Sequence, residues 1–145
     1  MQVDFYQLAG TPIEKTVPQL AAKTLENREK MLIIAEEDAM LSSLDEALWT
    51  YEATAFLPHG KATDVGPETQ PVLLSASPTA PNGARFALIA DGKWRDETLA
   101  FDRVFYLFDD DHIDEARKAW KALSQKDDVE PRYWKQDGGR WRQGP

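Results

Sequence analysis

Two histidines and two acidic runs are the residues of this sequence best suited to catalysis or metal binding. His59 and His112 are the only imidazoles, and carboxylates gather at residues 36–38 (Glu-Glu-Asp) and 109–111 (Asp-Asp-Asp). Each acidic run lies between an expected strand and an expected helix, where backbone N–H groups and the helix dipole stabilise carboxylates without a catalytic role. Because cysteine is absent and no H-x-x-x-H pair occurs, a zinc site would depend on carboxylates.

The glycine-rich loops that bind nucleotide phosphates are missing. The turn after the first expected strand, residues 9–12, reads Ala-Gly-Thr-Pro and has one glycine. Neither G-x-G-x-x-G nor G-x-x-x-x-G-K-[ST] occurs, and without such glycines the backbone cannot approach a phosphate closely. A G-x-S-x-G nucleophile elbow is missing as well. We therefore expect no nucleotide, no metal, no other cofactor and no enzymatic activity.

Two aromatic residues mark a candidate protein-binding surface. Leu48 belongs to the apolar stripe of an expected helix, and at 100° per residue Trp49 lies about 100° away from it, at the border of the buried face. Phe56 follows in a stretch that Pro58 keeps out of the helix. We expect the two rings to lie close together, partly exposed. They form either a small cluster beside the core or a patch for a partner protein.

The expected helix over residues 112–126 places two cations beside an apolar stripe. With Ile113 as zero, Trp120 lies near −20°, Arg117 near +40° and Lys121 near +80°, at roughly 100° per residue. A basic rim beside an apolar aromatic surface suits a peptide with acidic residues and an apolar or carboxylate end. An ordinary solvated helix edge has the same pattern, so this helix alone leaves both interpretations open.

Strands that alternate with helices must position these residues. We expect strands at 3–8, 31–35, 71–75, 86–90 and 104–108, helices at 16–27, 38–51 and 112–126, and a final strand or short-armed hairpin over 132–142. Residues 60–70 and 76–84 are expected to be loops. The run Met31–Ala35 is apolar throughout, as in a strand buried on both faces of a parallel sheet. The pattern predicts an α/β fold with a mainly parallel sheet.

Length and charge limit the possible functions. The chain has 145 residues and a hydrophobic fraction of 42%, which predicts one domain over 1–145. Its net charge is −8, divided into −10 for residues 1–111 and +2 for residues 112–145, so broad nucleic-acid binding is not expected. The sequence shows no run of about 18 apolar residues and no secretory signal, so we expect a cytoplasmic protein with no membrane contact.

Five short segments carry a resemblance to a known family. They are Phe5-Tyr6, Leu44-Asp45-Glu46-Ala47-Leu48-Trp49, Phe56-Leu57-Pro58-His59, Pro71-Val72 and Ala116-Arg117-Lys118-Ala119-Trp120-Lys121. In this order and spacing the sequence resembles the chi subunits of bacterial DNA polymerase III, over nearly the whole chain. The combination of L-D-E-x-L-W with F-x-P-H is the specific part, and the other segments add weight through their order.

The resemblance implies a fold, a role and two partner sites. The fold would be a single-domain, three-layer α/β structure of nucleotide-binding-like topology without a phosphate-binding loop. The role would be that of a non-catalytic accessory subunit in DNA replication, which joins the clamp-loader complex, through the psi subunit, to single-stranded-DNA-binding protein. Trp49 and Phe56 would contact psi. Arg117, Trp120 and Lys121, with Ile113 as an apolar wall, would hold the acidic, phenylalanine-ended tail of single-stranded-DNA-binding protein; Trp120 stands where a tyrosine is expected.

Other partners and functions stay open at this level. By the same resemblance the chain would be a monomer or a heterodimer with psi, where the organism has one, and would contact DNA indirectly. One alternative is a small-molecule enzyme whose site lies at the carboxyl edge of the sheet and uses His59 and the acidic runs. Another is a direct single-stranded-DNA binder that uses the basic, tryptophan-bearing C-terminus.

Overall fold

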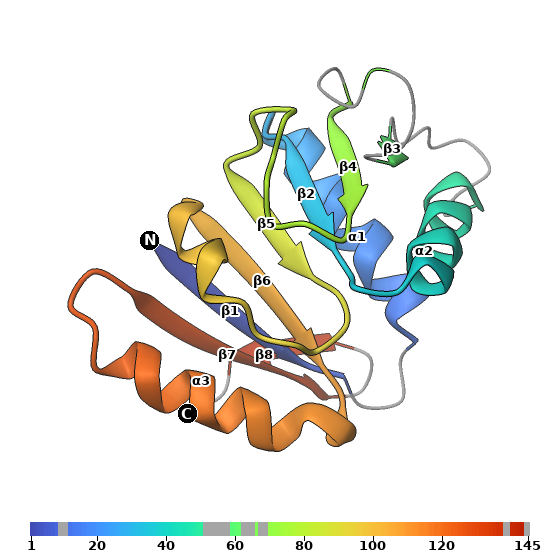
Figure 1. Cartoon of the computed structure of the whole chain (residues 1–145). Coiled ribbons are helices and arrows are strands. Elements are labelled where there is room, and N and C mark those ends of the chain that lie inside the picture. The colour runs from blue at the N-terminus through green and yellow to red at the C-terminus, as the bar shows by residue number, and fades with distance from the viewer. Residues whose placement is uncertain (9–11, 51–58, 62–65, 67–69, 138–139, 144–145) are drawn as a thin grey trace.

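Seven parallel strands and one antiparallel strand form a single sheet in the computed structural model of the chain (Figure 1). The structure describes residues 1–145 except 9–11, 51–58, 62–65, 67–69, 138–139 and 144–145. The strands follow one another across the sheet in the order β3-β4-β2-β5-β6-β1-β7-β8. Their bounds are β1 Gln2–Gln7, β2 Met31–Ile34, β3 His59–Lys61, β4 Val72–Ser75, β5 Phe86–Ile89, β6 Arg103–Phe108, β7 Glu130–Asp137 and β8 Arg140–Gln143.

Helices cover both faces of this sheet and make three layers. Helices α1 (Ile13–Glu26) and α2 (Asp38–Thr50) lie on one face, and α3 (Ile113–Ser124) lies on the other (Figure 1). Two short 3₁₀ helices, η2 (Asp96–Ala100) and η3 (Asp110–His112), precede β6 and α3. Among the described residues, no helix is long and apolar enough to span a bilayer.

The strand period divides the core into two clusters, one on each face. In β2, Met31 and Ile33 pack on the α1 and α2 side, whereas Leu32 and Ile34 pack on the α3 side. All four side chains are fully buried, as the unbroken apolar run predicts for a strand with helices on both faces. The expected α/β class with a mainly parallel sheet is therefore confirmed.

Two local expectations are wrong. Helix α1 begins at Ile13 rather than Thr16, because the extended backbone of Pro12 takes the N-cap position, and Pro18 lies inside the helix instead of opening it. Strand β3 lies partly in the stretch expected as a loop from residue 60. It is only three residues long, and it pairs along the outer edge of β4 without any apolar alternation. Of the two forms expected for the C-terminus, a final strand or a hairpin with a short second arm, the structure shows the hairpin, since β8 pairs antiparallel with β7.

A buried carboxylate ties the first strand to its neighbours. Asp4 on β1 is fully buried, and it accepts hydrogen bonds from Arg103 Nε at 2.8 Å and Trp134 Nε1 at 3.2 Å. The Arg103 guanidinium also lies 4.6 Å from the ring centre of Phe105. Strands β6 and β7 flank β1 in the sheet, so this network joins three adjacent strands.

Asp4→Ala is expected to lower the free energy of unfolding by about 3–5 kcal/mol, because it leaves a partly buried guanidinium without its carboxylate. Urea denaturation measures the change. Asp102→Ala is the matched control: Asp102 also pairs with an arginine, Arg85, but its side chain is 55% exposed, so its loss should cost no more than about 1 kcal/mol. Equal losses in the two variants would contradict a structural role for the buried network.

Candidate functional site

A pocket of about 430 Å³ lies between helix α3 and strand β7. Strands β1 and β6 form its floor, since β1 pairs with both β6 and β7. We call it the α3–β7 pocket, and it is lined by Phe5, Gln7, Phe108, Ile113, Ala116, Arg117, Trp120, Tyr133 and Lys135.

Aromatic packing shapes the floor and one wall of the α3–β7 pocket. The ring of Phe5 is fully buried and meets Trp120 edge-on, with their centres 5.1 Å apart. Trp120 in turn meets Tyr133 edge-on at 6.1 Å, and Tyr133 lies 6.3 Å from Phe108. Edge-to-face contacts of this kind fix ring orientation beyond what burial alone provides. The pocket is thus an apolar recess with a defined shape.

The polar residues of the α3–β7 pocket favour an anion. None of the described residues that line it is acidic, whereas Arg117 and Lys135 contribute two positive charges. The Arg117 side chain is 74% exposed and lies 3.9 Å from the exposed Asp114 carboxylate, a separation at which a surface pair contributes little. Tyr133 donates a hydrogen bond to Gln7 Oε1, and burial raises the pKa of Tyr133, which keeps its hydroxyl a donor. An apolar group beside an anionic group suits this arrangement.

The structure brings three of the four expected helix residues into one pocket. Ile113, Arg117 and Trp120 line the α3–β7 pocket, and Lys121 does not. The buried residues of α3 are Ala116, Ala119 and Leu123, so the centre of the buried stripe lies about 90° from Ile113, on the side away from Arg117, at roughly 100° per residue.

This phase explains where each expected side chain lies. Ile113 and Trp120 lie on one side of the buried stripe and are half-buried, while Arg117 lies at the pocket rim and Lys121 lies further out, exposed. The sequence prediction instead placed Ile113 and Trp120 within the stripe.

Two residues of the opposite wall were missed by the sequence analysis. Tyr133 and Lys135 are two apart on β7, so they share the α3 face, whereas Trp134 between them packs against Tyr6 in the other core cluster. The sequence already indicated that Tyr133 and Lys135 share one face of a strand, because residues 132–135 were expected to form a strand. Which face they occupy depends on the parallel pairing of β7 with β1, and the sequence does not specify that pairing.

The second expected site lies on the other face of the sheet. Trp49, near the end of α2, is 57% exposed, while its neighbour Leu48 is 1% exposed and packs in the core. The border position expected from the helical phase is therefore observed. Phe56 lies outside the described residues, so its expected closeness to Trp49 stays a prediction.

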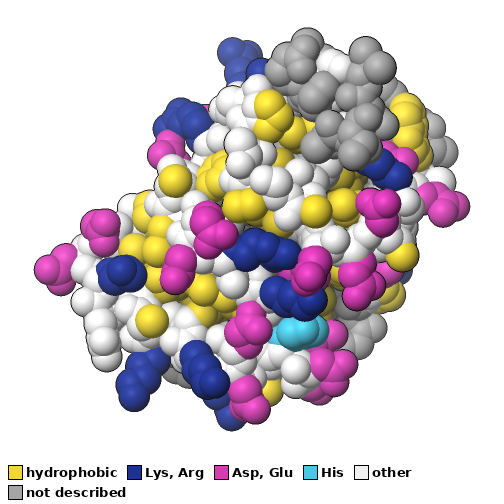
Figure 2. Space-filling model, in the orientation of Figure 1, with side chains coloured by type: hydrophobic (Ala, Val, Ile, Leu, Met, Phe, Trp, Pro, Cys, Tyr) yellow, Lys and Arg dark blue, Asp and Glu magenta, His cyan; other side chains and the backbone are white. Residues whose placement is uncertain are grey.

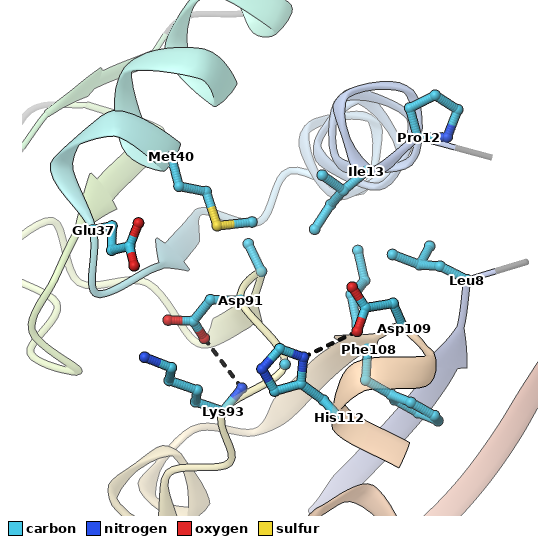
Figure 3. A pocket seen from close by; sticks show the side chains of 13 residues that line it. Leu8, Pro12, Ile13, Glu37, Met40, Asp91, Lys93, Phe108, Asp109 and His112 are labelled. Carbon is cyan, nitrogen blue, oxygen red and sulfur yellow. Dashed lines mark hydrogen bonds and ion pairs between the residues drawn. The ribbon is translucent and has the colours of Figure 1, made fainter. Parts of the chain in front are cut away.

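A second pocket, of about 570 Å³, lies at the carboxyl edge of the sheet (Figure 3). His112 and Asp109 face Met40 and Ile13 across it, and His112 Nδ1 is 3.0 Å from Asp109 Oδ1. Gly92 lines it with a positive φ, and a Cβ there would come within 2.6 Å of the His112 ring. We call this the edge pocket; it corresponds to the place expected for a small-molecule site.

Asp91, which lines the edge pocket, and Glu36, which lies outside its lining, are both held in ion pairs. Burial would raise the pKa of Asp91, but the bidentate Arg95 contact, at 2.9 Å for both bonds, and backbone N–H groups outweigh burial and lower it. Glu36 pairs with Lys93 at 2.5 Å. Within the part of the chain that the structure describes, no group of three His, Asp or Glu residues could hold a metal ion.

His59 is far from the acidic runs. It begins β3 and pairs with Val72 at the start of β4, and in a parallel sheet this is the amino edge. Residues 36–38 and 109–111 follow β2 and β6 at the carboxyl edge. The sequence alternative that combined His59 with the acidic runs in one site is therefore wrong in its geometry.

Charge on the visible surface is mixed. On the face shown in Figure 2, lysine and arginine side chains are interspersed with aspartate and glutamate, and no continuous basic patch crosses it. Such a distribution gives no extended track for a phosphate backbone on this face.

Comparisons with known proteins agree on one family. A family model described as "DNA polymerase III chi subunit, HolC" matches residues 1–129. The chain is 29% identical over 113 residues to the DNA polymerase III subunit chi of Escherichia coli (strain K12). This match covers 76% of this chain and 77% of the relative. It is 27% identical over 88 residues to the probable DNA polymerase III subunit chi of Rickettsia prowazekii (strain Madrid E). That second match covers 61% of this chain and spans about half, 53%, of the relative's length.

Leu48→Ala and Trp49→Ala are expected to differ in their effect on stability. Truncating the buried Leu48 removes core contacts and leaves a cavity, which should lower the free energy of unfolding by about 2–5 kcal/mol. Trp49→Ala should lower the free energy of unfolding by no more than about 1 kcal/mol, because Trp49 is exposed and surface substitutions have small effects on stability. Thermal and urea unfolding of the two variants measure both values. A larger loss for Trp49→Ala would make it a core residue rather than a surface one.

Proposed function

The chain belongs to the DNA polymerase III chi subunit family, and from this membership we propose that it is a non-catalytic adaptor that joins the polymerase complex to single-stranded-DNA-binding protein. Its family places it in DNA replication, as a subunit of a multiprotein enzyme. Under this proposal the protein works in the bacterial cytoplasm. It binds the psi subunit through one surface and the acidic tail of single-stranded-DNA-binding protein through another.

The α3–β7 pocket is the observation that carries the proposal. A tail that ends in phenylalanine presents a ring and a carboxylate on the same residue. The floor of Phe5 and Phe108, with Trp120 at its side, offers the ring an apolar recess, and the Arg117 guanidinium can bind the carboxylate through two parallel hydrogen bonds. A volume of about 430 Å³ falls within the usual range for ligand pockets.

Charge supports an acidic ligand at this place. Residues 1–111 have a net charge of −10 and would repel an acidic tail, whereas residues 112–145, which contribute α3 and β7, have a net charge of +2. Among the described residues that line the pocket none is acidic, and the two cations attract the aspartates that precede the phenylalanine. Attraction of this kind weakens as salt is added.

The position of Trp49 supports a psi-binding surface on the other side of the molecule. Exposed tryptophans are enriched among the residues that dominate binding energy at protein interfaces. Helix α2 and helix α3 cover opposite faces of the sheet (Figure 1), so two partners could bind at the same time without contact between them. Simultaneous binding is what an adaptor requires.

The two alternative functions have less support. A small-molecule enzyme would have to use the edge pocket without His59, because that residue begins β3 at the amino edge. Direct binding of single-stranded DNA would need a basic track, and no such track crosses the one face that Figure 2 shows.

Arg117→Ala is expected to weaken binding of an acidic, phenylalanine-ended peptide about tenfold or more, since it removes a charge-assisted hydrogen-bond donor from the pocket. Isothermal titration calorimetry at low salt measures the dissociation constant. Lys118→Ala is the matched control, because Lys118 is the adjacent exposed cation and does not line the pocket. Its effect should stay below about twofold. Binding that persists after deletion of the terminal phenylalanine, or equal affinities of the two variants, would contradict the proposal.

Trp49→Ala is expected to weaken binding to a purified psi subunit by roughly 2 kcal/mol, a typical loss when an anchoring tryptophan is truncated. The peptide affinity of the same variant should stay unchanged, because Trp49 lies across the sheet from the α3–β7 pocket. Size-exclusion chromatography with calorimetry follows both interactions. Unchanged psi binding would remove Trp49 from that interface.

A further inference from the structure

We propose that Lys135 on β7, rather than Lys121 on α3, is the second cation that the α3–β7 pocket offers to an acidic peptide. The aspartates that precede the terminal phenylalanine would then run along β7 and not along the outer face of α3. This inference rests on the proposed function, because it specifies which residues of the same pocket bind the ligand.

The first observation is the position of the two lysines. Lys135 lines the pocket from the wall opposite Arg117, so a ligand carboxylate inside the pocket has a cation on either side. Lys121 lies one helical turn after Arg117, and it is exposed outside the pocket lining. A peptide anchored in the pocket by its last residue would reach Lys135 directly, whereas Lys121 would require it to leave the pocket over the rim of α3.

The second observation is the charge state of β7. Arg132 pairs with Glu130 at 3.3 Å, so its charge is already partly neutralised. Among the residues that the structure describes, Lys135 has no carboxylate within ion-pair distance. Its ammonium group is therefore available to an incoming anion without first losing an intramolecular partner.

The third observation is how firmly the β7 wall is built. Tyr133, two residues before Lys135, meets Trp120 edge-on and donates its hydroxyl to Gln7. Trp134, between them, stacks on Tyr6 with the rings 15° from parallel on the opposite face. Contacts on both faces hold this part of β7 against β1, so the backbone that bears Lys135 is fixed before a ligand arrives, which reduces the entropy lost on binding.

The experiment measures how a labelled peptide, with consecutive aspartates before a C-terminal phenylalanine, binds to the full-length chain by fluorescence anisotropy. Lys135→Ala should raise the dissociation constant about fivefold, and Lys121→Ala should change it by less than about twofold, as expected for a direct and a remote charge respectively. Lys135→Arg should restore most of the affinity because it keeps the positive charge. Thermal unfolding of each variant checks that the fold is unchanged.

A second peptide, with asparagines in place of the aspartates, separates a direct contact from an indirect one. If Lys135 meets the aspartates, Lys135→Ala should have almost no effect on the asparagine peptide, and the two changes should not be additive. If the unsubstituted chain binds the aspartate peptide, but Lys135→Ala weakens that binding no more than Lys121→Ala does, this inference is overturned. The proposed function would stay in place. Failure of the original chain to bind the aspartate peptide at all would overturn the proposed function, and the inference with it.

Discussion

The contact between Phe5 and Trp120 connects the first strand of the chain to its last helix, and the candidate site depends on it. Phe5 lies on β1 in the interior of the sheet, and its ring also contacts Trp94, Tyr106 and Phe108. It is therefore both a central core residue and the floor of the α3–β7 pocket. Because the pocket is lined by residues that the core already holds in place, little ordering remains to be done when a ligand binds, and such preorganisation favours affinity.

The strand period of β1 gives the molecule two independent surfaces. Phe5 faces α3, whereas Asp4 and Tyr6 face the other side, where Asp4 bonds Arg103 and Trp134 and Tyr6 stacks on Trp134. A parallel sheet must be covered on both faces, and here α2 and α3 cover opposite faces (Figure 1). The same constraint that buries the sheet thus separates Trp49 on α2 from Arg117 on α3. Under the proposed function, this arrangement would keep two partners apart without a second domain.

Sequence patterns predicted the parts of this structure that depend on local periodicity. The apolar run at Met31–Ile34 predicted a doubly buried strand, and the helical period grouped Ile113, Arg117 and Trp120, which line one pocket. Helical phase also placed Trp49 at the border of the buried face, and it is exposed.

The missed parts depend on non-local pairing or on small local differences. Strand β3 is short and is defined by its pairing with β4, not by its composition. The pocket contribution of Lys135 required the strand order, because only the placement of β7 beside β1 turns its alternate side chains toward α3. Lys121 lies outside the pocket lining because the buried stripe of α3 is formed by Ala116, Ala119 and Leu123, whereas the prediction also placed Ile113 and Trp120 within that stripe.

An acidic protein can bind an acidic segment because electrostatic attraction in salt solution is local. At about 0.15 M ionic strength, charges separated by more than roughly 8 Å are largely screened. The negative charge of residues 1–111 therefore affects how often an acidic peptide approaches, while the charges within the pocket decide how long it stays. The part of the α3–β7 pocket lining that the structure describes has two cations and no acidic residue, so its local field is opposite in sign to that of the whole chain. The net charge of −8 then acts against nonspecific capture of polyanions such as nucleic acid, because an extended polyanion meets the whole surface and a short peptide meets only the pocket.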